Sequence, residues 1–182
     1  MKKSLAIVPV VMFLALFLMP SSAMGAEGDL VWVKTDGFSA VMSRVTGLAY
    51  DSSYLYVAGL DGTPGFLNTQ WRIEKRSADT GNVVWKKTNN PSAGLDSIEN
   101  ISLGIDGVYV VGDDYSPANF FDAQARIEKR SLVDGSIIWV KTNNYSSGLS
   151  KVDYTSGIAV DNAGFYTFGN DSAIASGSSD SQ

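Results

Sequence analysis

The sequence predicts an all-β protein, a β-propeller of four-stranded antiparallel blades with about 2.75 blades in the chain. Three observations support this prediction. Turn and strand residues recur about every 54 residues along the chain, and each unit contains four short strand-like segments. In residues 27–182, no window of about 11 residues or more shows the 3.6-residue periodicity of an amphipathic helix.

The repeat is most evident in two long matching stretches. Gln70–Asn90 aligns without a gap with Gln124–Asn144, and 13 of the 21 aligned positions are identical. A shorter part of the same pattern, a glycine followed four residues later by tryptophan, occurs a third time at Gly28–Thr35. Three copies of one pattern in one order indicate a repeat architecture.

Each unit is typical of four strands joined by tight turns. Strand one ends in an aspartate that we expect to cap the hairpin by accepting backbone N–H groups. Strand two ends in a Tyr-x-x-Gly pattern, strand three begins at Gln70 or Gln124, and a glycine turn leads to the strand that carries tryptophan. The three aspartates are Asp51, Asp106 and Asp161. Small residues expected to line a crowded axis from strand one are Ala49, Gly104 and Ala159.

These landmarks predict where the blades lie. The predicted segments are strand four of one blade at 28–35, a blade at 46–88, a blade at 100–142 and a partial blade at 155–182. By loop length Gln182 takes the place of Gln70 and Gln124, so we expect a fragment of a longer propeller. The alternative is a short protein that completes its ring by oligomerising. A three-fold sandwich and a parallel β-helix are the structural rivals, and the hairpin in each repeat disfavours the helix.

The segment 1–26 has the pattern of a secretory signal peptide. Lys2 and Lys3 precede an apolar run from Leu5 to Met19, and small residues follow up to Ala26. A run of this length is short against the roughly 20 residues that span a bilayer, which disfavours an uncleaved anchor. We therefore expect residues 27–182 to be secreted, in the periplasm or at the cell surface, with no membrane span.

Composition excludes several classes of chemistry. The chain has no cysteine and no histidine, so it can form neither a disulfide framework nor a Ser–His–Asp triad. Its net charge of −5 makes nucleic acid an unsuitable partner. Hydrophobic residues make up 45% of the chain, enough for a packed core.

The turn before each tryptophan carries a resemblance to a known family. Gly81 and Gly135 follow aspartate-containing turns and precede Trp85 and Trp139 by four residues. This pattern resembles the repeat of the pyrroloquinoline-quinone-like (quinoprotein-type) β-propellers. The resemblance implies that tryptophan docks one blade on the next, and the positions it marks are Trp32, Trp85 and Trp139.

A stripe of alternating charge recurs on strand three. Arg72, Glu74 and Arg76 would lie on one face of the strand, as would their counterparts in the next repeat. One interpretation is a charged ligand groove. The other, favoured because the whole stripe is copied, is structural pairing of glutamate in one blade with arginine in the next.

Polar residues gather in the loops between strands two and three and between strands four and one. In a propeller these loops lie on one rim, and variable loops on a rigid scaffold are common binding sites. The candidate rim residues are Asp61, Asn89, Asn90, Asp113, Asp114, Tyr115, Asn143, Asn144 and Asp171. Their oxygens could bind Ca²⁺, but no Asp-x-Asp-x-Asp loop is present, so no metal or cofactor is predicted.

The sequence favours a secreted, non-catalytic scaffold that binds a protein or glycan at its rim. Open sheet edges would also permit self-association. One alternative, suggested by the resemblance, is part of a quinoprotein-type dehydrogenase. Another is a carbohydrate-active propeller, for which the aromatic candidates are Tyr115, Phe120, Phe121 and Tyr145. In either alternative the catalytic residues would lie outside this segment.

Overall fold

A computed structural model describes residues 30–35, 42–115, 122–144, 151–171 and 180–181, and these contain strands and no helix. The all-β prediction is therefore confirmed. The first sheet contains β1 (Ser43–Tyr50), β2 (Tyr54–Gly65), β3 (Asn68–Ser77) and β4 (Val83–Asn89). The second contains β5 (Ser97–Gly104), β6 (Gly107–Asp114), β7 (Asp122–Arg130), β8 (Ile137–Asn143) and β9 (Lys151–Val152). The third contains β10 (Tyr154–Val160), β11 (Phe165–Asp171) and β12 (Asp180–Ser181).

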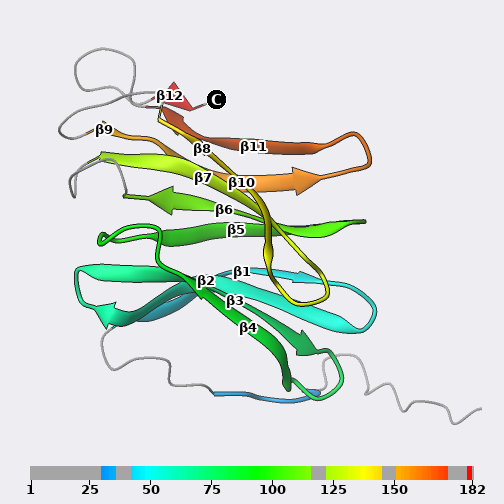
Figure 1. The fold of residues 1–182 in the computed structure, drawn as a ribbon. Helices are drawn as coiled ribbons and strands as arrows, with labels where there is room; N and C mark the ends of the chain where they lie inside the picture. The colour runs from blue at the N-terminus through cyan, green and yellow to red at the C-terminus, as the bar shows by residue number, and fades with distance from the viewer. Residues whose placement is uncertain (1–29, 36–41, 116–121, 145–150, 172–179, 182) are drawn as a thin grey trace, which may run out of the picture. The chain divides into compact units, whose positions relative to one another are not determined.

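Apart from β9, the strands of each sheet follow one another in chain order, as Figure 1 shows. All neighbouring pairs are antiparallel except β9, which pairs in parallel with the start of β7. The three sheets are separate, and the described residues do not close into a ring. The four-strand order predicted for the two complete units is thus confirmed.

Every unit carries a β-bulge at the same place, opposite the glycine that ends the Tyr-x-x-Gly pattern. The register between strands one and two shifts after Val45, Ile98 and Thr155, whose partners are Gly59, Gly112 and Gly169. A Cβ on these glycines would lie 1.9–2.0 Å from a carbonyl oxygen of strand one. The repeated glycine is therefore required by the close approach of the bulged strand.

A substitution at Gly112 tests this requirement. Because the clashing atom is the backbone oxygen of Ser97, it cannot move away as a side chain can. We expect Gly112→Ala to lower the free energy of unfolding by about 2 to 4 kcal/mol in denaturant titrations. Ile105→Ala, at an 89% exposed turn position, should change it by less than about 0.5 kcal/mol. Equal effects of the two substitutions would contradict the close approach.

The main core lies between the first and second sheets. Tyr56, Ile73 and Trp85 of the first sheet pack with Val108 and Val110 of the second, and all five are buried. Polar contacts accompany this packing: the Trp71 indole donates to the Asp113 carbonyl oxygen at 3.1 Å, and the Asn89 amide donates to Glu128 at 3.1 Å. The first and second sheets thus pack face to face through both apolar contacts and hydrogen bonds.

Two details of strand one differ from the sequence prediction. Ala49 lies opposite Tyr56, but the residue in that place in the second sheet is Ser102, opposite Tyr109. Gly104 instead ends β5, because this strand runs further into a tight turn at Ile105–Asp106. The expected hairpin capping therefore occurs at Asp51 and Asp161, which each accept two backbone N–H groups. Asp106 instead accepts hydrogen bonds from the side chains of Tyr109 and Lys129.

The predicted strand at 28–35 is not formed in its described part, residues 30–35. In the two complete units, strand four is formed by pairing with strand three, and residues 30–35 pair with no described strand. At the other end the chain enters strand three two residues earlier than loop length predicts, because Asp180 pairs with Asp171 where Gln70 pairs with Asp61.

Candidate functional site

The Arg-Glu-Arg stripe forms a buried ladder of charges within each complete sheet. In the first sheet, Arg72 and Arg76 each donate Nε to opposite oxygens of Glu74 at 2.6 Å. Asp61 accepts from Arg72 at 3.5 Å, and Arg76 also donates to the Gly81 carbonyl oxygen at 3.0 Å. Two acidic and two basic groups thus neutralise one another inside the protein.

The second sheet repeats this ladder. Glu128, 0% exposed, accepts from Arg126 at 2.9 Å and from Arg130 at 2.7 Å. Asp114 accepts from Arg126 at 3.1 Å, and Gly135 takes the place of Gly81. The prediction that glutamate pairs with arginine of the next blade is wrong. The pairs form along one strand because residues two apart share a face, and it is Asn89 that crosses between sheets to reach Glu128.

The two ladders change the interpretation of two predicted rim residues. Asp61 and Asp114 were expected in loops but lie in β2 and β6, 3% and 1% exposed, as the acidic ends of the ladders. Asp171 occupies the equivalent place in β11 and is half-buried. These three aspartates recur at the same position of strand two, as expected of residues with a structural role.

A second polar cluster fixes the rim between the first and second sheets. Asp96, fully buried, accepts from the backbone N–H and hydroxyl of Ser92 at 2.8 and 2.7 Å, and from the backbone N–H of Tyr115 at 2.9 Å. Gly94 lies against the Tyr115 side chain, so close that a Cβ would be 2.6 Å away. Asp96 therefore joins the β4–β5 loop to the end of β6.

Asp113 lies beside this cluster and is held in its protonated form over an unusual range of pH. Burial, followed by the negative charges of Glu99 and Asp96, raises the pKa of Asp113 to about 8. Its Oδ1 atom is buried and has no hydrogen-bond partner. Burial likewise raises the pKa of Asp96. A carboxyl group with a pKa near neutrality can serve as an acid, and Glu99 and Asp96 are the acidic groups that act on Asp113 here.

The raised pKa has a consequence for stability. Between the ordinary pKa near 4 and about 8, the folded protein retains a proton that the unfolded chain releases, so the contribution of Asp113 to stability falls as pH rises. We expect Asp113→Asn to raise the free energy of unfolding by about 1 to 3 kcal/mol at pH 8 and to change it little at pH 4. Urea titrations at the two pH values measure this difference, and a substitution that destabilises more at pH 8 would contradict it.

The remaining predicted rim residues are brought to the same end of the sheets. Figure 1 shows the β2–β3 and β4–β5 connections at that end, opposite the β1–β2 and β5–β6 hairpins. Asn90, Asn143 and Asn144 are exposed, whereas Asn89 and Tyr115 are half-buried in the contacts described above. Phe120, Phe121 and Tyr145 lie outside the described residues, as does segment 1–26, for which a signal peptide was predicted.

Two rim residues were missed by the sequence analysis. Phe66 and Leu67 form the tip of the β2–β3 connection and are 69% and 56% exposed. The signal was present, because Pro64–Gly65 marks a turn and two large apolar residues directly after a turn are unusual. The rim thus combines an apolar tip with a polar surround.

Each tryptophan of the repeat has a defined environment. The Trp32 indole donates to the Ala78 carbonyl oxygen at 2.7 Å, and the Trp85 indole donates to the equivalent Leu132 oxygen at 3.4 Å. The rings lie against Gly81 and Gly135, where a Cβ would be 2.7–2.8 Å away, and both glycines have left-handed φ angles of 69° and 73°. Trp139 is half-buried and lies 5.6 Å from the ring of Phe165 in the third sheet.

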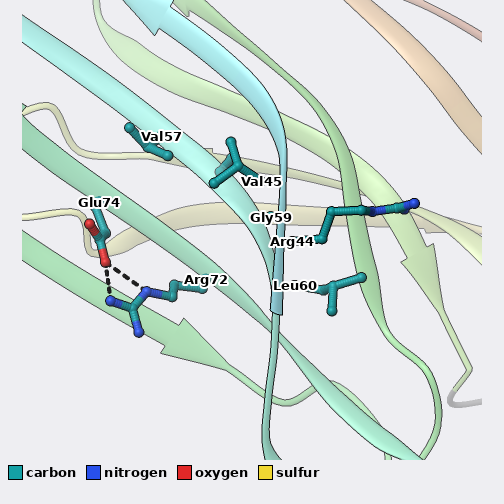
Figure 2. Close-up of a pocket in the computed structure, with 8 residues that line it drawn as sticks. Arg44, Val45, Val57, Gly59, Leu60, Arg72 and Glu74 are labelled. Atoms are coloured by element: carbon teal, nitrogen blue, oxygen red, sulfur yellow. Dashed lines mark hydrogen bonds and ion pairs between the residues drawn. The ribbon is translucent and has the colours of Figure 1, made fainter. Parts of the chain in front are cut away.

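The outer face of the first sheet carries a shallow groove, shown in Figure 2. Val45 and Val57 line it together with the paired side chains of Arg72 and Glu74. In the second sheet the equivalents of the two valines, Ile98 and Val110, are fully buried under the first sheet, whereas Val45 is 57% exposed.

Neither a metal centre nor a membrane helix is found in the described part of the chain. No three acidic residues there are grouped so as to hold a metal ion. No helix among those residues is long and apolar enough to cross a bilayer. Comparisons of the chain with models of protein families, with curated proteins and with solved structures found no match.

Proposed function

We propose that this chain is a secreted array of propeller-type blades that acts as a non-catalytic scaffold and binds a protein or glycan at its rim. The observation that carries the proposal is the pair of ladders. The charges of the Arg-Glu-Arg stripe, which could have formed a ligand groove, are neutralised in the same way in both complete units, as expected of structural elements.

In this proposal the tryptophans dock successive blades. Trp32 and Trp85 make equivalent contacts to equivalent turns, which supports a shared role. Trp139 would make the same contact to a further blade. The propeller itself also belongs to the proposal, since it requires a closed set of such blades.

The rim is the binding face because it combines rigid support with exposed apolar surface. Asp96 fixes the β4–β5 loop through three hydrogen bonds, so the loop loses little further freedom on binding. Phe66 and Leu67 project from the neighbouring connection. An exposed aromatic side chain beside polar groups suits the faces of sugar rings and the apolar anchors of protein partners.

Binding to a glycan array tests the rim assignment. We expect Phe66→Ser to weaken binding at least tenfold, because an aromatic anchor at the centre of an interface carries a large share of the binding energy. Val133→Ser, which alters an 84% exposed position on the β7–β8 turn at the opposite end, is the matched control. Equal binding by both variants and the wild-type protein would contradict the rim assignment.

A second assay tests the absence of catalysis. The protein is incubated with pyrroloquinoline quinone, Ca²⁺ and a panel of alcohols and aldoses, and reduction of an electron-accepting dye is followed. We expect no turnover above that of the cofactor alone. Turnover that depends on the protein would contradict the proposal and favour the quinoprotein alternative.

A further inference from the structure

We infer that two copies of this chain associate head to tail, with the third sheet of one copy packed on the outer face of the first sheet of the other. The inference rests on the proposed blade array and names one partner for it, a second copy of the same chain. The two surfaces are the head surface, formed by Val45, Leu48 and Val57, and the tail surface, formed by Tyr166 and Phe168.

The head surface is exposed where its counterparts are covered. Leu48 pairs with Val57 in the first sheet as Ile101 pairs with Val110 in the second. Leu48 is 61% exposed, but Ile101 is only 5% exposed because it lies in the core between the two sheets. The head surface therefore has the composition and register of a surface that, one repeat later, is a buried interface.

The tail surface shows the same contrast from the other side. Tyr166 and Phe168 pair with Ala159 and Gly157 as Tyr56 and Ala58 pair with Ala49 and Gly47. Tyr56 and Ala58 are each 1% exposed against the second sheet, whereas Tyr166 and Phe168 are 59% and 60% exposed. The tail surface, which is the counterpart of the face that covers the second sheet, is thus exposed among the described residues.

The β3–β4 turn of the first sheet, outside the head surface, is already covered by a tryptophan side chain. Trp32 occupies the β3–β4 turn of the first sheet as Trp85, a strand-four residue, occupies the β7–β8 turn of the second. The head surface is the part of the first sheet that strands one to three of a preceding unit would contact. The third sheet consists of strands at these three positions of a unit, namely β10, β11 and β12. Trp32 of one copy and the third sheet of the other would together make one composite blade.

The head-to-tail mode predicts a specific behaviour in mixtures. The double variant Val45→Glu/Leu48→Glu blocks the head and leaves the tail free, whereas Phe168→Glu blocks the tail and leaves the head free. We expect the wild-type protein to show a mass well above that of one chain in light scattering at about 100 μM, and each variant alone to be a monomer. A mixture of the two variants should form a discrete heterodimer, because one free head and one free tail remain. Val133→Glu, at an exposed position outside both surfaces, should associate like the wild-type protein.

The other outcomes would overturn the inference. A monomeric wild-type protein at this concentration would show that the surfaces do not bind each other. A blocked variant that still associates alone would indicate head-to-head, tail-to-tail or edge pairing. Circular dichroism and a cooperative unfolding transition are recorded for each variant, so that a loss of folding is recognised. Failure of association with folded protein leaves the glycan and cofactor assays to decide the proposed function independently.

Discussion

Replacing Glu128 by glutamine is expected to lower the free energy of unfolding by about 3 to 5 kcal/mol, the range found when one partner of a buried ion pair is removed. Glu128 is fully buried and accepts from Arg126 and Arg130 on opposite carboxylate oxygens. The amide of glutamine keeps the shape but offers one acceptor and no charge. Arg130 would then be left with the Gly135 carbonyl oxygen as its remaining acceptor in the ladder.

Urea titrations at pH 7 measure this loss. Arg44→Ala is the matched control, because Arg44 also faces a carboxylate, that of Glu99, but across 3.8 Å and with its own side chain 62% exposed. Exposed pairs of this kind contribute about 0 to 1 kcal/mol, so the control should lose little stability. Similar losses in the two variants would mean that the ladder is open to solvent and does not hold the sheet together.

Replacing Trp85 by alanine is expected to cost about 3 to 5 kcal/mol, because the substitution removes a large buried ring from the interface between the first and second sheets. The ring lies 6.2 Å from that of Tyr56 in an edge-on arrangement and rests on Gly135. Its indole N–H also satisfies the Leu132 carbonyl oxygen. Filling of the cavity is restricted because Gly135 belongs to a tight turn.

Trp139→Ala provides the comparison at the equivalent position of the next unit. Trp139 is only half-buried, so we expect a smaller loss of about 1 to 2 kcal/mol. Both variants are measured by thermal and chemical unfolding. If Trp139→Ala cost as much as Trp85→Ala, the cost would reflect the strand position alone and not how deeply the ring is buried against the following sheet.

The repeat made the sheets predictable, but not the registers within them. Alternating strand residues and turn glycines recur in the sequence, so the strand order could be expected. The resemblance of the repeat implied docking by tryptophan, but not the turn that each ring contacts. The place of Gly104 could not be predicted, because β5 has one more paired residue after its bulge than β1 has, and this depends on the Ile105–Asp106 turn. The β-bulges explain afterwards why Gly59, Gly112 and Gly169 recur, since the close carbonyl oxygen is visible only in three dimensions.

The site was harder to predict for a related reason. Asp61 and Asp114 resemble loop aspartates in sequence, and only the pairing of β2 with β3 and of β6 with β7 places them beside an arginine. Asp113 and Asp114 are adjacent in the sequence, and because side chains alternate along a strand, their carboxyl groups lie on opposite faces of the sheet. One joins a ladder and the other lies near Asp96 and Glu99, where its pKa rises.

The most direct test of the blade packing is a nuclear Overhauser spectrum of the isotopically labelled protein. If each unit docks on the following one through its tryptophan, the ring protons of Trp85 will show strong cross-peaks to the Hα protons of Gly135, and those of Trp32 will show them to Gly81. Cross-peaks from the Trp85 ring to Gly81, in its own sheet, without any to Gly135 would contradict the packing of successive sheets.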